Sequence, residues 1–105
     1  PEVIRRMARC AFRSGDLNNS EKWMRNIPNI SLSEEDYRMM GHIAFLKNDI
    51  AEAIRLYRLT IRPNDEKRIW KSHILSEMDI LENLGASRTT LLLLLESIAY
   101  ANEKK

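Results

Sequence analysis

The chain has 105 residues, 44% of them hydrophobic and 30% charged, a composition typical of one folded domain and not of a disordered segment. Only three Gly and three Pro interrupt it, so we expect an all-α protein. The formal net charge of +2 does not by itself indicate nucleic-acid binding, and the longest apolar run, at 91–95, is far short of the roughly 18 residues that indicate a membrane span. Because the sequence starts with Pro1, we expect a piece of a longer protein, and its compartment stays open.

Turn signals divide the chain into six segments with apolar residues at helical spacing. The breaks fall at 14–16, 26–36, 47–49, 62–66 and 85–87. The apolar residues are, segment by segment, Val3, Met7, Cys10 and Ala11; Leu17, Trp23 and Ile27; Tyr37, Met40, Ala44 and Phe45; Ile50, Ala53, Ile54, Tyr57 and Ile61; Ile74, Met78, Leu81 and Leu84; Leu91, Leu94, Leu95, Ile98 and Ala101. The spacing predicts six helices, the fifth running unbroken over 66–84. Cys10, the single cysteine, is expected to be a small buried hydrophobe.

Capping residues stand at the predicted helix ends. Ser33 with Asp36, and Asp49 with Glu52, have the spacing at which a side chain caps the first turn and an acid three residues later reaches back to it. Residues suited to a left-handed position follow three of the predicted helices: Gly15, Asn48 and Gly85. The segments therefore read as antiparallel helical hairpins.

A short stretch occurs twice. Residues 11–17 read AFRSGDL and residues 44–50 read AFLKNDI, 33 positions apart. In this pattern the Ala lets two helices approach, the Phe fills the space beside it, Gly or Asn reverses the chain and Asp caps the returning helix. One such hairpin cannot bury its apolar face alone, so a period in the thirties is typical of stacked hairpins.

These residues resemble the tetratricopeptide repeat family. The second repeat, 34–63, matches its pattern best, at Tyr37, Met40, Gly41, Ala44, Ala53, Tyr57 and Pro63. Repeats at about 1–31 and 66–103 match less well, and Glu77 stands where the third should have an apolar residue. The resemblance implies one domain over 1–105, a right-handed superhelical stack of three hairpins with six helices. The competing interpretation is an unrelated six-helix bundle with one chance repeat.

In this family the first helices of successive hairpins line a concave groove that accepts a peptide or a helix. The resemblance therefore implies a protein-protein interaction module, a scaffold or adaptor, with this groove lined by Arg5, Arg9, Phe12, Arg13, Arg38, His42 and Phe45. Such a basic, partly aromatic face suits an acidic peptide, because guanidinium groups pair with two carboxylate oxygens at once. The Lys and Asn residues of the family's carboxylate-clamping subgroup are missing, and Asp79 and Glu82 stand in the third repeat instead.

Catalytic and metal-binding patterns are missing from the sequence. His42 and His73 stand alone on separate helices, and one cysteine cannot complete a zinc site with them. His73 and Glu77 lie one helical turn apart, a spacing that is more often a solvated pair than half of a metal site. We expect no enzyme activity, no metal and no cofactor.

Two further interpretations stay open. Leu92, Leu93 and Tyr100 are apolar groups left over on the last helix, which predicts self-association as a homodimer or contact with other parts of a longer chain. The alternative function is a nucleic-acid-binding helical repeat. It draws on Trp23 and Trp70 and on six Arg or Lys against three acids in residues 1–30, but the charge after residue 30 is balanced, so we expect no nucleic acid.

Overall fold

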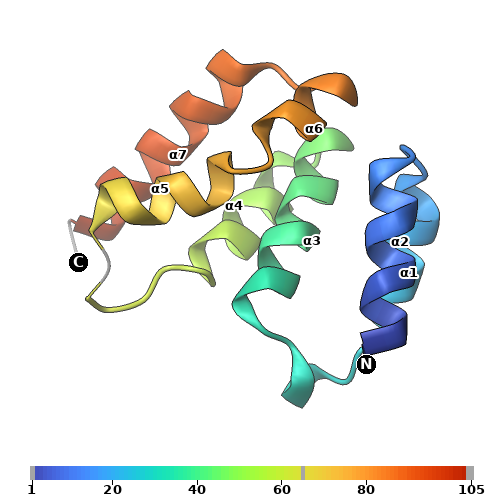
Figure 1. Ribbon diagram of the computed structural model, residues 1–105. Coiled ribbons are helices and arrows are strands. Elements are labelled where there is room, and N and C mark those ends of the chain that lie inside the picture. Colours follow the sequence, from blue (N-terminus) through green and yellow to red (C-terminus); the bar gives the residue numbers. More distant parts are fainter. Residues whose placement is uncertain (1, 65, 104–105) are drawn as a thin grey trace.

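The computed structural model describes residues 2–64 and 66–103, and the regular structure in this part of the chain is helical, without strands. Two hairpins come first, α1 (Glu2–Arg13) with α2 (Leu17–Arg25) and α3 (Glu34–Leu46) with α4 (Ile50–Arg58); a 3-10 turn at Asn29–Ser31 connects them. In the third hairpin, α5 (Lys67–Leu75) and α6 (Met78–Asn83) form the first arm, and α7 (Arg88–Glu103) is the returning helix. The prediction of an all-α fold is confirmed (Figure 1).

The same turn reverses the chain in all three hairpins. Gly15, Asn48 and Gly85 have φ angles of +87°, +64° and +103°, so the predicted left-handed positions are confirmed. At each turn the next amide donates to the carbonyl five residues back, from Asp16 to Ala11 and from Asp49 to Ala44 at 2.8 Å, and from Ala86 to Leu81 at 2.9 Å. This is the bond that ends a helix in a Schellman motif. The third hairpin thus uses the same turn although its sequence lacks the Ala-Phe pair.

The predicted caps are present at the starts of α3 and α4. Ser33 and Asp36 form a complete capping box, in which the Asp36 carboxylate accepts the Ser33 amide at 2.9 Å. Asp49 accepts the Glu52 amide at 3.3 Å, while the Glu52 side chain pairs with Arg55 and does not reach back. Each cap satisfies an amide that the helix itself leaves without a partner.

Small residues let the two helices of each early hairpin pack closely. Ser20 on α2 donates its hydroxyl to the Ala8 carbonyl at 2.8 Å, and both residues are fully buried. In the second hairpin Gly41 faces the Tyr57 ring, and a methyl group at Gly41 would lie 2.7 Å from Cε1 of that ring. Gly41 is therefore required by the approach of α3 to α4.

The predicted single helix over 66–84 is wrong. Helical hydrogen bonding stops after Leu75 and resumes at Met78, with Glu77 at φ −105° and ψ 17° between them. The Ser76 hydroxyl donates to the His73 carbonyl at 2.8 Å, a local bond that competes with the helix. Glu77 is turned toward Arg9 on α1, to which it is ion-paired at 3.4 Å. The interruption thus reflects a long-range contact, and seven α-helices replace the expected six in the described residues.

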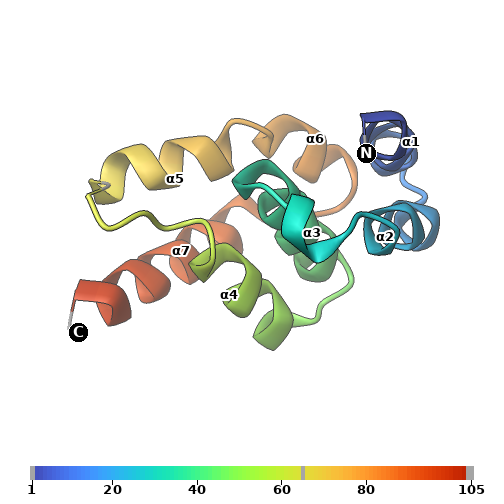
Figure 2. The same cartoon turned by 90° about the horizontal axis from the view of Figure 1, so that it is seen from below.

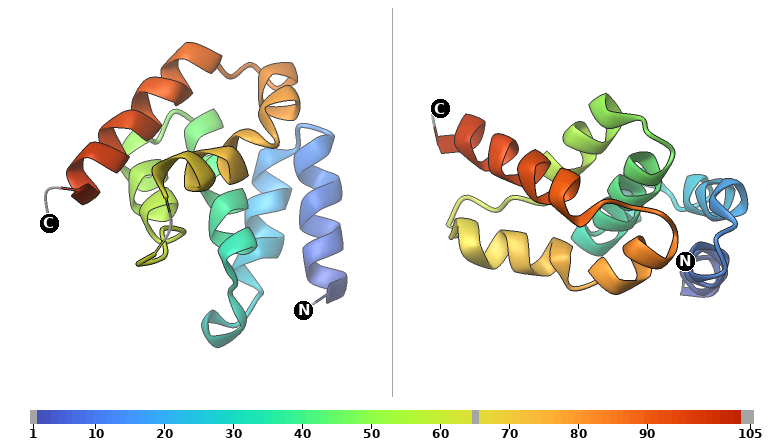
Figure 3. Two further views of the ribbon diagram at one scale, coloured as in Figure 1. Left: turned by 60° about the vertical axis from the view of Figure 1, so that its left-hand side comes forward. Right: turned by 90° about the horizontal axis from the view of Figure 1, so that it is seen from above.

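The hairpins are arranged side by side. The α1–α2 hairpin lies at one end of the molecule, α2 packs next to α3, and α4 packs next to α7 (Figure 2). The last helix runs back antiparallel to α5 and α6 (Figure 3). Cys10 is exposed, contrary to the prediction, whereas Ile43, 33 residues later, is buried.

Gly41→Ala should destabilise the fold. Alanine gains about 1 kcal/mol over glycine in a helix, but forcing a methyl group against the buried Tyr57 ring costs about 1–3 kcal/mol. We expect a lower midpoint in urea unfolding followed by circular dichroism. An increase in the free energy of unfolding, by the amount that helix propensity alone supplies, would show that the α3–α4 seam has room for a side chain.

Candidate functional site: a charged cleft between α3 and α5

The aromatic half of the predicted groove lies in the core. Phe12 and His42 are 0% exposed and Phe45 is 8% exposed, so the expectation that these three side chains face a groove is wrong for the described structure. The Phe12 ring stacks on the His42 ring with centroids 6.2 Å apart. The faces of α1 and α3 that carry them are needed to pack the hairpins together, and an aromatic side chain gains most when it is buried.

His42 is a structural histidine at the centre of this core. Its Nδ1 and the Tyr57 hydroxyl share a hydrogen bond of 2.8 Å, and the two rings meet edge to face. Burial, then the positive charges of Arg38 and Arg9, lower the pKa of His42 to about 3. Burial, together with the nearby Glu77 carboxylate, raises the pKa of Tyr57. Both groups are therefore neutral at physiological pH.

Arg5 is occupied by a structural role. Its Nε lies 2.9 Å from Oδ1 of Asp36, one terminal nitrogen donates to Oδ2 of Asp36 at 2.8 Å and to the Ser31 carbonyl at 2.6 Å, and the other donates to Glu2 at 3.2 Å. Burial alone would raise the pKa of Asp36, but hydrogen bonds from Arg5 and Ser33 outweigh it, and the pKa lies below its usual value. Arg5 thus fixes α1 against the start of α3.

The two remaining α1 arginines differ. Arg9 pairs with Glu77 at 3.4 Å, so the glutamate that breaks the repeat pattern binds the first hairpin to the third. Arg13 is exposed at the end of α1, and within residues 2–64 and 66–103 it forms no ion pair. The structure therefore does not gather Arg5, Arg9 and Arg13 into one anion-binding surface.

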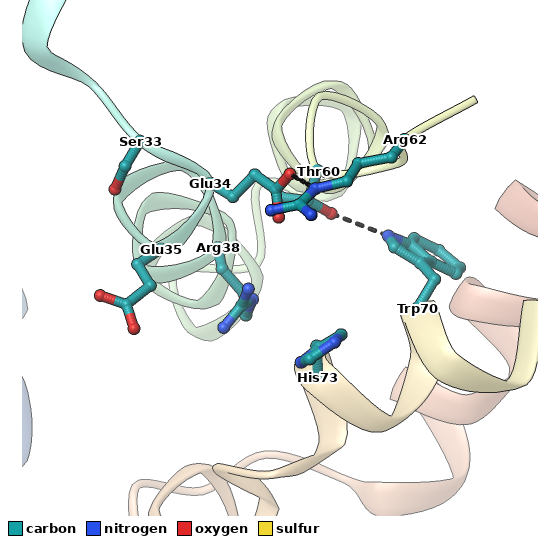
Figure 4. Close-up of a pocket in the computed structure, with 8 residues that line it drawn as sticks. All are labelled: Ser33, Glu34, Glu35, Arg38, Thr60, Arg62, Trp70 and His73. Atoms are coloured by element: carbon teal, nitrogen blue, oxygen red, sulfur yellow. Dashed lines mark hydrogen bonds and ion pairs between the residues drawn. The ribbon is translucent and has the colours of Figure 1, made fainter. Parts of the chain in front are cut away.

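Arg38 has a different environment from the other predicted arginines. It lines a cleft of about 450 Å³ between the start of α3, the segment after α4, and α5. Its side chain is half-buried, its Nε is buried without a hydrogen-bond partner, and it forms no ion pair with any described residue. Figure 4 shows Arg38 and His73 extending into the space between α3 and α5. The cleft thus holds a half-buried cation with unused donor capacity.

The rest of the cleft wall is polar and of mixed charge. Glu34 is ion-paired with Arg62 across the cleft mouth (Figure 4). Glu35 is exposed on the side toward α1, where it also lines a smaller pocket beside Arg5, Arg6 and Arg9. Acidic and basic groups therefore stand within one cleft, which suits a ligand that carries both signs of charge.

Trp70 forms the inner end of the cleft as a buried anchor. Its indole Nε1 donates to the Thr60 hydroxyl at 2.8 Å, and that hydroxyl donates to the Tyr57 carbonyl at 2.6 Å. Trp70 is 3% exposed, so it is not displayed for stacking on a base, while Trp23 is half-buried. The sequence pattern did not place His73, Thr60 or Trp70 beside Arg38, because they come from the third repeat and from a loop with no signature of its own.

The last helix presents the apolar groups that the sequence singled out. Leu92, Leu93 and Tyr100 are 37%, 64% and 61% exposed, while Leu91, Leu95 and Ile98 on the same helix are buried. One apolar stripe of α7 therefore packs against the rest of the protein, and part of a second apolar stripe is exposed.

Comparison of the chain with protein-family models, with curated proteins and with solved structures finds no match. In the described ranges, no group of three or more His, Cys, Asp or Glu side chains is placed to hold a metal ion. None of the helices formed by these same residues is both long and apolar enough to cross a membrane.

The buried His42 should make stability depend on pH. Because its pKa is about 3 in the fold and about 6.5 when unfolded, the unfolded chain binds more protons between these values. The free energy of unfolding should therefore fall as the pH drops below 6.5, by up to about 1.4 kcal/mol per pH unit. Urea titrations between pH 6.5 and about 4.5, above most carboxyl titrations, measure the slope.

His42→Gln, which keeps polar atoms near Tyr57 but cannot titrate, should remove most of this slope. The matched control is His73→Gln, which deletes the only other histidine, an exposed one, and should retain it. An equal slope in wild type and His42→Gln would contradict a neutral buried imidazole.

Proposed function

We propose that the chain is a protein-interaction module, a TPR-like scaffold or adaptor unit, that binds an acidic peptide segment in the cleft between α3 and α5. The support for a right-handed repeat stack is the recurrent hairpin: the same left-handed turn three times, and small residues at the seams of the first two hairpins. We propose no catalytic role and no resident cofactor. The proposal for the peptide depends on Arg38.

The proposed function depends mainly on one observation, the half-buried Arg38 guanidinium. A buried donor without a partner costs about 1–3 kcal/mol, more when it is charged, and a ligand that satisfies it recovers that cost. A carboxylate fits best, since it can accept two parallel hydrogen bonds from one guanidinium. Arg5 and Arg9 already have carboxylate partners in Asp36 and Glu77, so neither offers the same gain.

The other charges of the cleft restrict the ligand further. His73 stands opposite Arg38, while Glu35 lies at the rim with no ion pair among the described residues. A peptide with an Asp or Glu for Arg38 and a Lys or Arg beside it for Glu35 would match both. A phosphate backbone would meet the Glu34 and Glu35 carboxylates, and the buried Trp70 offers no stacking surface, so a nucleic-acid-binding repeat receives less support.

Charge reversal at Arg38 tests the proposal. Peptides selected from a random library on the whole chain should be enriched in Asp or Glu, and a fluorescent selected peptide should lose at least about tenfold in affinity on Arg38→Glu, because the bidentate pair becomes a repulsion. Fluorescence anisotropy measures the affinity, and binding should weaken as salt rises. Arg58→Glu, with the same charge change on an exposed residue outside the cleft, is the matched control and should bind normally.

Selected peptides without acidic residues, or equal affinity for wild type and Arg38→Glu, would overturn the acidic-peptide assignment. An equal loss of affinity on Arg58→Glu would show that the overall charge of the protein, and not Arg38, sets the affinity.

A second copy of the chain is a further candidate partner, favoured by α7. Counting from the capping residues Asp16, Asp49 and Ser87, the position of Leu93 corresponds to Lys22 and Arg55, which are charged and exposed. The first two hairpins thus have a charged residue at the position where α7 has an exposed leucine. We propose that this surface, with Leu92 and Tyr100, mediates homodimer formation.

Light scattering at about 100 μM should therefore give a mass above that of the 12.3 kDa monomer, and Leu93→Lys, which restores the charge of the other hairpins, should return the monomer mass. Arg58→Glu on exposed α4 surface serves as the control. A monomer mass for the wild type at this concentration would exclude the α7 surface as a dimer interface.

A further inference from the structure

The side of α1 that faces away from the rest of the molecule has an unusual composition. Val3, Met7 and Cys10 follow one another at helical spacing and are all exposed, Val3 at 71% and Met7 at 44%. Arg6 and Arg13 border the same stripe, and both are exposed. We call these five residues the outer α1 face; it lies at the end of the molecule formed by the first hairpin (Figure 2).

The internal repeat shows what this face does elsewhere in the chain. Moving 33 positions from Met7 and Cys10 leads to Met40 and Ile43 on α3. Ile43 is 1% exposed and Met40 is half-buried, and both line a pocket with Met24 of α2. In the second hairpin this face of the first helix is thus an interface that receives a helix.

The outer α1 face and the corresponding face of α3 differ in the residues that flank them. This difference indicates what kind of helix could cover the outer α1 face. Positions 6 and 13 correspond to Met39 and Leu46 on α3, where Met39 is 5% exposed and Leu46 is half-buried. On α1 they are arginines, and neither forms an ion pair within the described part of the chain. A helix that covered the outer α1 face with apolar groups alone would bury two cations without partners, at a cost that exceeds the gain from covering Val3 and Met7.

The α2–α3 contact shows how a cation beside such an apolar face can be paired. Beside Met24, α2 carries Glu21, whose carboxylate pairs with Lys47 at the end of α3 at 3.4 Å. An apolar side chain with a carboxylate one turn away on the same helix is therefore the combination that already packs on this type of surface. The outer α1 face requires the same combination with the acidic edge extended to two positions, one for Arg6 and one for Arg13.

We propose that the outer α1 face is a docking surface for an acidic amphipathic helix of a partner protein. The helix places an aliphatic row over Val3, Met7 and Cys10, and Asp or Glu residues along one edge pair with Arg6 and Arg13. The outer α1 face does not include Arg38, although Arg6 and the cleft residue Glu35 both line the smaller pocket beside Arg5 and Arg9. A partner that used both would be held at two points of the same chain, with a corresponding gain in affinity.

The single cysteine reports occupancy of this face without any alteration of the protein. Cys10 is exposed in the middle of the stripe, so its rate of alkylation by iodoacetamide measures access to the outer α1 face. The probes are two hydrocarbon-stapled helical peptides matched in length to α1, whose 12 residues extend about 18 Å. Both have the same leucine row; one has a Glu edge and the other a Lys edge. Stapling is needed because short isolated helices are marginal in water.

The Glu-edged peptide should slow alkylation of Cys10 roughly tenfold at saturation, and the Lys-edged peptide should leave it unchanged. The double variant Arg6→Glu with Arg13→Glu should reverse this preference, since both side chains are exposed and contribute no ion pair whose loss would unfold the chain. The variant Arg38→Glu should be protected as well as the wild type, because the outer α1 face does not include Arg38.

Three outcomes would overturn the proposal. Protection by neither peptide would show that the face accepts no helix, and equal protection by both would show that the arginines do not select the partner. Protection that rises with the concentration of the protein alone would identify a second copy of the chain, and not an acidic helix, as the occupant.

Discussion

The carboxylate of Asp36 joins the two elements on which the arrangement of the hairpins depends. It completes the capping box that starts α3, and it accepts the guanidinium fork of Arg5 from α1. Because Arg5 also binds the Ser31 carbonyl, the connection between the first two hairpins is held at both sides of the turn. A hairpin that is apolar on one face must lie against a neighbour, and this contact sets which neighbour and in what orientation. The low exposure of Asp36, 4%, makes the paired geometry obligatory.

The same requirement divides the α1 arginines and Arg38 into those that are ion-paired between hairpins and those that form no ion pair among the described residues. Arg5 and Arg9 are drawn into ion pairs with Asp36 and Glu77, which connect the first hairpin to the second and third. Arg38 is left half-buried at the cleft, and Arg6 and Arg13 are left on the outer α1 face. The arginines at the start of the sequence and Arg38 therefore do not form one basic surface. The cleft and the outer α1 face each have cations that would favour a carboxylate. Their separation follows from the packing, because a guanidinium that has a buried partner is no longer available to a ligand.

The first and last helices differ in how they depart from the internal repeat of the sequence. At α1, the exposed face corresponds to one that α2 covers on α3, so the same type of face is exposed on α1 and covered on α3. At α7, Leu93 stands where the other hairpins have exposed Lys22 and Arg55. The position is exposed in all three hairpins, and only α7 has an apolar residue there. The internal repeat serves as the reference in both cases. The exposed apolar side chains of α1 and those of α7 therefore have different origins.

Sequence patterns were enough to predict the helical class, the hairpin turns at Gly15, Asn48 and Gly85, and the caps at Ser33 and Asp49. These features depend on atoms a few residues apart, so their chemistry is complete within a short segment. Only the tertiary structure decided that Phe12 and His42 are core residues, that Cys10 is exposed, that the helix over 66–84 is interrupted at Glu77, and that Arg38 shares a cleft with His73. Helical spacing shows which residues share a face, but burial and ion pairing depend on which neighbour that face meets, and that neighbour is distant in the chain.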